Sequence, residues 1–165
     1  MATNYFAYGS NMASYRLLSR IPGAIQTDTA VLPQHRLRFR KSDNGESGKC
    51  DVEMTGNLAD NVHGVVYQIS RMEKEILDHY EGLGIGYSEK PIEITASSGR
   101  ILSAFTYYAM IIDENLIPYH WYKEHVLRGA IEHDLPQSYI AAIRQTPSKM
   151  DLDYIRRERE LAIYG

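Results

Sequence analysis

The sequence predicts an α+β fold with a curved sheet or barrel. Segments rich in β-branched and aromatic residues fill the first two thirds of the chain, and helical periodicity dominates the last third. Neither an internal repeat nor a linker divides the chain. Strands followed by helices in this order are typical of an α+β domain. We therefore expect residues 1–165 to form a single domain.

The first segment predicts a strand, a tight turn and a helix start. Tyr5–Tyr8 is short and aromatic, as many strands are. Gly9–Asn11 follows directly, and glycine permits a turn while serine or asparagine caps a helix. We expect that helix to run from Met12 to Arg20, because Pro22 lies just beyond it.

The middle of the chain predicts a series of strands. Thr27–Arg40 is expected to be extended, because apolar residues alternate with arginines over its last part. Ser42–Asp51 is rich in Gly, Ser, Asp and Asn and predicts a mobile loop. Four further segments carry β-branched and aromatic residues. They are Val52–Leu58, Gly64–Ile69, Tyr87–Ala96 and Ile101–Ile112.

Helix signals are clearest around residue 70. Ser70 and Glu73 form a capping box, apolar residues follow at helical spacing, and Gly82 supplies a stop. We expect a helix over Arg71–Tyr80, with Glu81 in its last turn or just beyond. Three more helices are expected near the end of the chain. They are Tyr119–Glu132, Gln137–Arg144 and Leu152–Leu161.

Composition limits the possible functions. The formal net charge of −3 provides no basic field for nucleic acid or an anionic membrane. Cys50 is the only cysteine, so an internal disulfide is impossible and a reducing, cytoplasmic location is expected. The first residues lack the pattern of a signal peptide, and no apolar run reaches membrane-helix length. With 13 Tyr against 3 Phe, the chain suits either a wet pocket or ordinary packing, and packing is favoured.

Two segments carry residues suited to chemistry. The Tyr8–Asn11 turn can direct unpaired N–H groups at a carboxylate or a developing oxyanion, unless it only caps the helix. At Glu81, the helix dipole and partial burial would both disfavour the charged form, which suits general acid–base work. A solvated glutamate is the alternative. Asp78 and Glu89 are competing acids, and the residues alone do not choose among the three.

Other chemistries find little support in the sequence. His120 and His125 are five residues apart, which does not place them on one helix face, and His133 has no partner motif. Neither a nucleophile elbow nor a Walker loop occurs. We interpret Cys50 as incidental. No metal or other cofactor is expected.

Together these segments resemble the γ-glutamylcyclotransferase family. Tyr5–Met12 is similar to the family's N-terminal signature, and Val65–Tyr67 to the strand before its catalytic helix. Leu77–Gly82, followed by Gly86-Tyr87, looks like its acid-bearing segment. Asp134–Tyr139 is similar to a late segment that contributes a substrate-contacting tyrosine. The order and spacing hold over nearly the whole chain.

The resemblance implies a mixed β-barrel flanked by short helices, and an enzyme that cyclises γ-glutamyl amino acids or amines to 5-oxoproline. It assigns the catalytic acid/base to Glu81, and substrate contacts to Tyr139 and to a run that acts largely through its backbone. That run is Tyr5, Phe6, Ala7, Tyr8, Gly9 and Ser10. Tyr87 follows Gly86 directly, where relatives have an intervening residue, so the resemblance assigns it no contact. A homodimer is implied.

Several functional alternatives stay open from the sequence. The same chemistry could act on glutathione, γ-glutamylamines or a γ-glutamyl-protected biosynthetic intermediate. A noncatalytic module that senses a small acidic metabolite is a different class. Ser42–Asp51 and the C-terminal helices could line the leaving-group side. The aromatic residues Tyr119, Trp121 and Tyr122 are expected in the core rather than in an interface.

Overall fold

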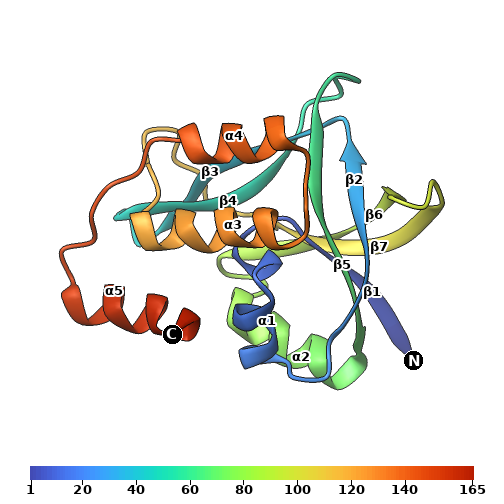
Figure 1. Cartoon of the computed structure of the whole chain (residues 1–165), viewed down its shortest axis with the longest axis horizontal. Helices are drawn as coiled ribbons and strands as arrows, with labels where there is room; N and C mark the ends of the chain where they lie inside the picture. Colours follow the sequence, from blue (N-terminus) through green and yellow to red (C-terminus); the bar gives the residue numbers. More distant parts are fainter.

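The computed structural model describes all residues, Met1–Gly165, and is built around a closed five-stranded barrel (Figure 1). The barrel strands are β1 (Ala2–Ala7), β2 (Ile25–Pro33), β5 (Asn61–Ser70), β6 (Tyr87–Ala96) and β7 (Ile101–Ala109). Around the barrel they follow the order β1-β5-β2-β6-β7. β1 pairs in parallel with β7 at Tyr5 and Phe105, and the other neighbours are antiparallel. The predicted mixed barrel is confirmed.

The segment expected to be a mobile loop is part of a hairpin. β3 (His35–Asp43) and β4 (Ser47–Met54) form a separate two-stranded sheet, so the loop prediction for Ser42–Asp51 is wrong. Asn44 and Gly45 have φ of 53° and 73°, which gives the turn a twist that matches the strands. A Cβ at Gly48 would lie 2.0 Å from the Phe39 carbonyl oxygen. Close backbone approach therefore explains glycine inside this strand.

The stretch expected to be continuous over Thr27–Arg40 is interrupted. Gln34 has φ of 60° and separates β2 from β3. The expected helix from Met12 is also divided, because Ala13 is extended with ψ of 112°. A short 3₁₀ turn, η1 (Ser10–Met12), precedes helix α1 (Ser14–Arg20). The chain thus leaves β1 through two bends before its first helix.

The remaining helices agree with the sequence apart from their ends. They are α2 (Arg71–Glu81), α3 (His120–Glu132), α4 (Gln137–Gln145), α5 (Tyr154–Leu161) and a final 3₁₀ turn, η2 (Ala162–Tyr164). The capping box of α2 is present in both directions between Ser70 and Glu73. Gly82 ends this helix with φ of 63°. Glu81 is therefore its last residue.

Helices cover the barrel on two sides. In Figure 1, α3 and α4 lie side by side next to the β3–β4 hairpin, and α1 and α2 lie together at one end of the barrel. Because β5 faces the barrel interior on one side and helices on the other, Val65, Val66 and Tyr67 are all buried. None of the helices is both long enough and apolar enough to cross a bilayer.

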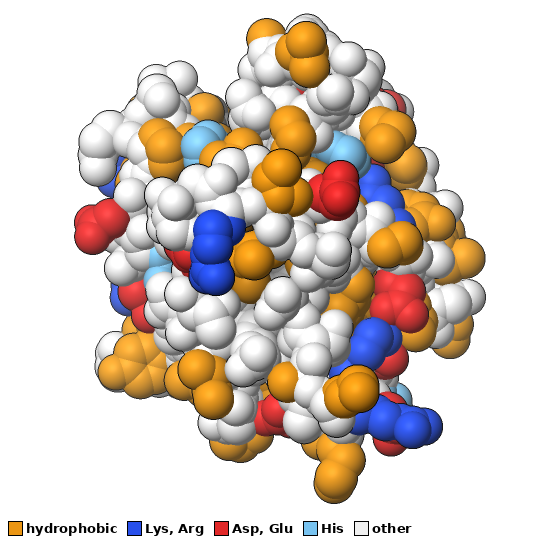
Figure 2. All heavy atoms as spheres, turned by 90° about the vertical axis from the view of Figure 1, so that its right-hand side faces the viewer, with side chains coloured by type: hydrophobic (Ala, Val, Ile, Leu, Met, Phe, Trp, Pro, Cys, Tyr) orange, Lys and Arg blue, Asp and Glu red, His pale blue; other side chains and the backbone are white.

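The outer surface of the barrel carries mixed charges. Figure 2 shows acidic, basic and hydrophobic side chains interspersed over the face that lies at the right of Figure 1. Basic side chains on this face form no continuous patch.

Close contact between α3 and η1 fixes the turn that follows β1. A Cβ at Gly129 would lie 2.5 Å from Met12 Cβ and 2.6 Å from the Ala13 amide nitrogen. Only glycine allows α3 to approach the turn this closely. The position of Ser10 and Asn11 therefore depends on Gly129, which lies far along the chain.

We predict that Gly129→Ala destabilises the protein by about 1–3 kcal/mol through overpacking against η1. Alanine alone would improve helix propensity by about 1 kcal/mol, so a net loss must come from the steric contact. Equilibrium unfolding in urea measures it. The exposed Ile131 on the same helix supplies the control Ile131→Ala, expected within about 0.5 kcal/mol of the parent. A more stable Gly129→Ala protein would contradict the proposed close packing.

Candidate active site

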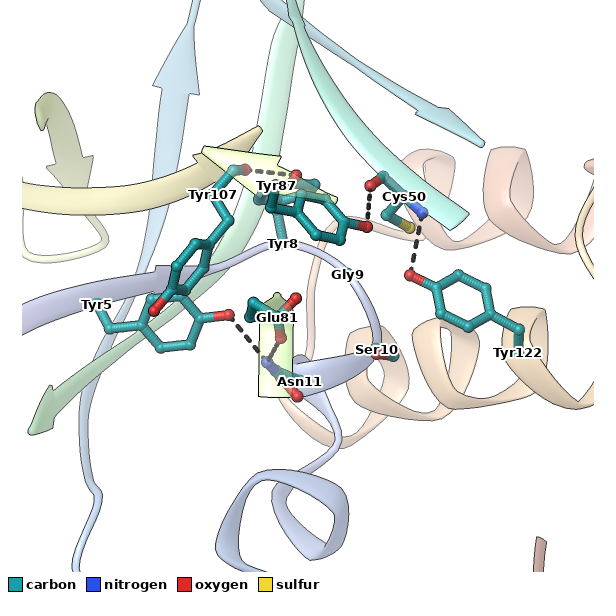
Figure 3. Close-up of a pocket in the computed structure, with 10 residues that line it drawn as sticks. All are labelled: Tyr5, Tyr8, Gly9, Ser10, Asn11, Cys50, Glu81, Tyr87, Tyr107 and Tyr122. Atoms are coloured by element: carbon teal, nitrogen blue, oxygen red, sulfur yellow. Dashed lines mark hydrogen bonds between the residues drawn. The ribbon is translucent and has the colours of Figure 1, made fainter. Parts of the chain in front are cut away.

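One small pocket brings together the two segments that the sequence singled out (Figure 3). Its cavity volume is about 30 Å³, and it lies where the end of β1, the η1 turn and the end of α2 meet. The pocket is lined by Tyr5, Tyr8, Gly9, Ser10, Asn11, Cys50, Glu81, Tyr87, Tyr107 and Tyr122. Glu81 and the Tyr8–Asn11 turn therefore share one cavity.

The Glu81 carboxylate is held from one side. Its Oε1 accepts a hydrogen bond from Asn11 Nδ2 at 2.8 Å and lies 3.4 Å from Arg20 Nη1. The same Arg20 nitrogen donates to Asn11 Oδ1 at 3.1 Å, which closes a triangle of carboxylate, amide and guanidinium. Asn11 also donates to the Tyr5 hydroxyl at 3.1 Å. The Glu81 side chain is 15% exposed, so these partners fix its position.

The second carboxylate oxygen and a backbone amide are free for a ligand. Glu81 Oε2 has no hydrogen-bond partner in the protein, and neither has the Gly9 N–H. Both residues line the pocket. A residue with an unpaired carboxylate oxygen and one with an unpaired backbone N–H thus line the same space. The sequence predicted that the helix end and burial alone act on the charge of Glu81. The structure adds the positive charge of Arg20 beside it.

The two competing acids are engaged elsewhere. Asp78 lies 3.0 Å from Lys74 Nζ and accepts a hydrogen bond from the Tyr107 hydroxyl at 2.5 Å. Glu89 lies 2.7 Å from the same Lys74 nitrogen. Neither acid lines the pocket. Of the three acids that the sequence left open, only Glu81 lines the pocket.

Five tyrosines give the pocket a polar but uncharged wall. The Tyr8 hydroxyl donates to the Tyr107 carbonyl at 2.6 Å, and the Tyr87 hydroxyl donates to the Cys50 carbonyl at 2.7 Å. Burial raises the pKa of Tyr8, Tyr87 and Tyr122 well above the ordinary value. These phenols stay protonated at neutral pH. Glu81 is consequently the only charged residue among the ten that line the pocket.

Cys50 has a structural place in the site, contrary to its interpretation as incidental. Its N–H donates to the Tyr122 hydroxyl at 3.0 Å, and its carbonyl accepts from Tyr87. A Cβ at Gly9 would lie 3.0 Å from Cys50 Cβ, so the two segments touch. Burial raises the pKa of the Cys50 thiol, which makes it a poor nucleophile.

The predicted substrate-binding residues are only partly brought together. Tyr5, Tyr8, Gly9 and Ser10 line the pocket, whereas Phe6, Ala7 and Tyr139 do not. The Phe6 carbonyl already accepts from the Thr106 hydroxyl, and the Phe6 ring packs near Gly64. Tyr139 lies against the His63 ring, with centroids 4.7 Å apart.

Three tyrosines of the pocket were assigned no part in it by the sequence. They are Tyr87, Tyr107 and Tyr122. Tyr122 is buried as expected for α3, yet its hydroxyl reaches β4 and the pocket wall. The excess of tyrosine over phenylalanine was the available signal, but composition cannot say which tyrosines converge. No three His, Cys, Asp or Glu side chains gather as a metal site would require.

A charged network ties the C-terminal helix to the turn. Arg16 donates from Nε to the Ser10 hydroxyl at 3.1 Å and from Nη1 to Glu160 Oε2 at 2.7 Å. His125 Nε2 lies 3.3 Å from the same Glu160 oxygen. Burial would raise the pKa of Glu160, but the His125 hydrogen bond and the Arg16 charge outweigh it and lower that pKa to about 2. α5 thus helps to fix Ser10.

Known proteins are similar to this chain in sequence and in fold. A model of the AIG2-like family matches residues 61–143. The γ-glutamylcyclotransferase of Bos taurus is 33% identical over 144 residues, which cover 82% of this chain and 73% of the bovine protein. The Mus musculus enzyme is 32% identical over 143 residues, with the same coverage. A solved structure named γ-glutamyl cyclotransferase has a TM-score of 0.88 at 24% identity and 99% coverage of both chains, a likeness of fold.

The fold and the pocket define a small barrel protein whose binding site is centred on one anchored carboxylate. The chain belongs to the γ-glutamylcyclotransferase family. The resemblance of its motifs to that family is therefore confirmed.

We predict that Glu160→Gln lowers the free energy of unfolding by about 2–3 kcal/mol at pH 7, because a pKa depressed by folding stabilises the folded state above the unfolded pKa. The pKa of Glu160 falls from 4.5 to about 2 on folding, so this stabilisation disappears as the pH falls through that interval. Urea unfolding at several pH values measures it. Glu158→Gln on the same helix is the control. If the parent and Glu160→Gln differed in free energy of unfolding by the same amount at pH 7 and at pH 2, the proposed charged network would be contradicted.

We predict that Tyr122→Phe costs about 1–3 kcal/mol of stability, because it leaves the buried Cys50 N–H without an acceptor. Tyr139→Phe is the matched comparison, since the buried Tyr139 hydroxyl has no hydrogen-bond partner. Its loss is expected to change stability by less than about 0.5 kcal/mol. Urea unfolding of both variants measures the difference, and the reverse order would refute this assignment of the two hydroxyls.

Proposed function

We propose that this protein cyclises γ-glutamyl amino acids or amines to 5-oxoproline and releases the free amine, with Glu81 as general acid/base. The observation that carries this proposal is that Glu81 and Gly9 line one pocket, while Glu81 Oε2 and the Gly9 N–H have no protein partner. The reaction joins two parts of one substrate. The site therefore needs chiefly to fold that substrate and to move one proton.

In the proposed reaction the substrate α-amine attacks its own γ-carbonyl carbon. A carbon–nitrogen bond forms to the α-nitrogen, and the bond from that carbon to the leaving nitrogen breaks. Glu81 accepts the proton that the α-nitrogen loses and returns it to the leaving nitrogen, so protons balance over the cycle. In this scheme the Gly9 N–H donates to the γ-carbonyl oxygen as it becomes negative. The anchored Oε1 keeps the carboxylate oriented throughout.

Tyr5, Tyr8 and Ser10 are proposed to contact the glutamyl group. Their phenol and hydroxyl groups border Glu81 without adding charge, which leaves the α-amine free to be neutral when it attacks. Contacts from Phe6, Ala7 and Tyr139 stay predictions of the resemblance. Neither a metal nor an organic cofactor has a place in this scheme. Glutathione, γ-glutamylamines and γ-glutamyl-protected intermediates remain candidate substrates of the same reaction.

We also propose a cytoplasmic location and a homodimer. The location is supported by the single cysteine, which is buried and free. The homodimer is supported only by the family resemblance. Light scattering of the purified chain tests it.

We predict that Glu81→Gln lowers the turnover of γ-glutamyl-alanine by about 10²–10⁴-fold, because the amide cannot accept the α-amine proton. The measurement is 5-oxoproline released per unit time. The variant keeps an oxygen for the Asn11 hydrogen bond, so its fold should be retained, as circular dichroism can check.

Two controls test the choice of acid. Asp78→Asn and Glu89→Gln remove carboxylates that lie outside the pocket and are expected to keep turnover within about threefold of the parent. Near-parental turnover by Glu81→Gln would refute Glu81 as the base. Tight binding of γ-glutamyl-alanine by the parent, without any 5-oxoproline, would favour a noncatalytic sensing module instead.

A further inference from the structure

A second pocket opens beside the first and has the opposite electrical character. The two pockets share Ser10, Glu81, Tyr87 and Tyr122. The second pocket adds a group of basic residues and one tyrosine, which are Arg16, Arg20, Lys41, Lys49 and Tyr80. We call the first the inner pocket and the second the outer pocket. Glu81 stands at their boundary, so a bond broken beside it divides the substrate between them.

Three of the four cations have anionic partners. Arg16 pairs with Glu160, and Arg20 pairs with Glu81. Lys49 Nζ lies 3.1 Å from Asp43 Oδ2. The carboxylates within ion-pair distance of the four cations are those of Glu160, Glu81 and Asp43. Each of them is already paired with Arg16, Arg20 or Lys49.

Lys41 is the cation left without a full partner. Its Nζ makes no hydrogen bond, and its nearest anion is Asp43 Oδ1 at 4.0 Å, a carboxylate already engaged by Lys49. Only 9% of the residue is exposed. Burial, followed by the Lys49 charge, lowers the pKa of Lys41. A nearly buried ammonium with so little compensation is unfavourable unless a ligand supplies an anion.

The surroundings of Lys41 keep its ammonium beside the reacting region. It lies 5.1 Å from the centroid of the Tyr87 ring, which lines both pockets. A Cβ at Gly86 would lie 3.2 Å from Lys41 Cε and Nζ. Glycine in the loop after Glu81 therefore leaves room for the lysine. The β3–β4 hairpin thus brings Lys41 and Lys49 to the outer pocket.

Charge decides which part of a substrate enters which pocket. The glutamyl α-amine must be close to Glu81, and four neighbouring cations would repel it if it were protonated. It therefore belongs in the inner pocket with the neutral tyrosines. The leaving amine then extends into the outer pocket. An anionic group on that leaving amine would find the Lys41 ammonium.

We propose that Lys41, assisted by Lys49, is a specificity-determining residue that binds a carboxylate on the leaving amine. This inference rests on the function proposed above. It assigns the preferred donor as a γ-glutamyl compound whose leaving amine carries an anionic group. Asp43 weakens the preference for an anionic leaving amine, because it neutralises part of the positive charge of the two lysines.

Two donors that differ by one carboxylate test the proposal. γ-Glutamyl-alanine releases alanine, and γ-glutamyl-ethylamide releases ethylamine, which is alanine without its carboxylate. KM and kcat for 5-oxoproline release are measured for both, together with dissociation constants by calorimetry. Lys41→Met should raise KM for γ-glutamyl-alanine about 10- to 100-fold more than KM for the ethylamide. The ratio of the two kcat values should move little, since the carboxylate is remote from the reacting bond.

A second variant should act in the opposite direction. Asp43→Asn frees both lysines and should lower KM for γ-glutamyl-alanine several-fold relative to the ethylamide. A merely structural part for Lys41 would not produce opposite changes in the two variants. Lys90→Met is the control, because Lys90 is a half-buried lysine that, like Lys41, lies near a tyrosine ring, but it lines neither pocket. Its ratio of KM values should equal that of the parent.

Three outcomes would overturn the proposal. Equal KM increases for both donors in Lys41→Met would place the lysine on the glutamyl side. If the ratio of the two KM values were unchanged in both Lys41→Met and Asp43→Asn, Lys41 would have no part in selecting the leaving amine. If the parent releases no 5-oxoproline from either donor, the proposed function fails, and the calorimetric affinities still decide the carboxylate preference. Equal parental affinity for the two donors would then refute it.

Discussion

The triangle of Glu81, Asn11 and Arg20 is the interaction on which the site depends. Asn11 lies in the 3₁₀ turn after β1, Arg20 ends α1, and Glu81 ends α2 after β5. β1 and β5 are antiparallel, with Ser70 opposite Ala2, so α2 begins at the far end of β1 and its 11 residues return Glu81 to Asn11 in the turn after β1. Without the barrel register these three groups would not meet. The triangle holds one carboxylate oxygen and leaves the other directed at the pocket, which suits a residue that must exchange a proton from a fixed position.

The uncharged wall around that carboxylate is the second constraint. Each buried phenol satisfies its hydroxyl with a backbone group or a side chain, so the wall is polar without a counter-charge. Phenylalanine would fill the same space but leave the carbonyl groups of Tyr107 and Cys50 without these donors. This explains why tyrosine gathers here. It also explains why the Cys50 backbone matters more than its thiol, because the pocket wall is attached to its N–H and carbonyl.

Local signals predicted the parts of this structure that local chemistry determines. The capping box and Gly82 placed the end of α2 at Glu81 to within one residue, and the Gly9–Asn11 turn was identified from glycine and capping residues. The β3–β4 hairpin was missed because its turn and the start of β4 are rich in small polar residues, which locally indicate a loop. The need for glycine at Gly48 shows only when the Phe39 carbonyl oxygen lies opposite it across the hairpin. Tyr122 was placed in the core but not at the pocket. Its hydroxyl accepts a hydrogen bond from the Cys50 N–H of β4, which is 72 residues away in the sequence, so local signals could not predict this contact.

The division between inner and outer pocket suggests how such a barrel can keep its chemistry while changing its substrates. The inner pocket is built mainly from barrel strands and the segments that follow them, and its tyrosines also belong to the hydrophobic core. The outer pocket takes two of its cations from the β3–β4 hairpin, which forms a sheet of its own and closes no part of the barrel. Substitutions at Lys41 or Lys49 therefore alter the charge of the outer pocket without removing a member of the Glu81 triangle. In the proposed scheme the lysines that choose the leaving group thus lie on a different element from the Glu81 triangle, while Cys50 on β4 joins the same hairpin to the wall of the inner pocket.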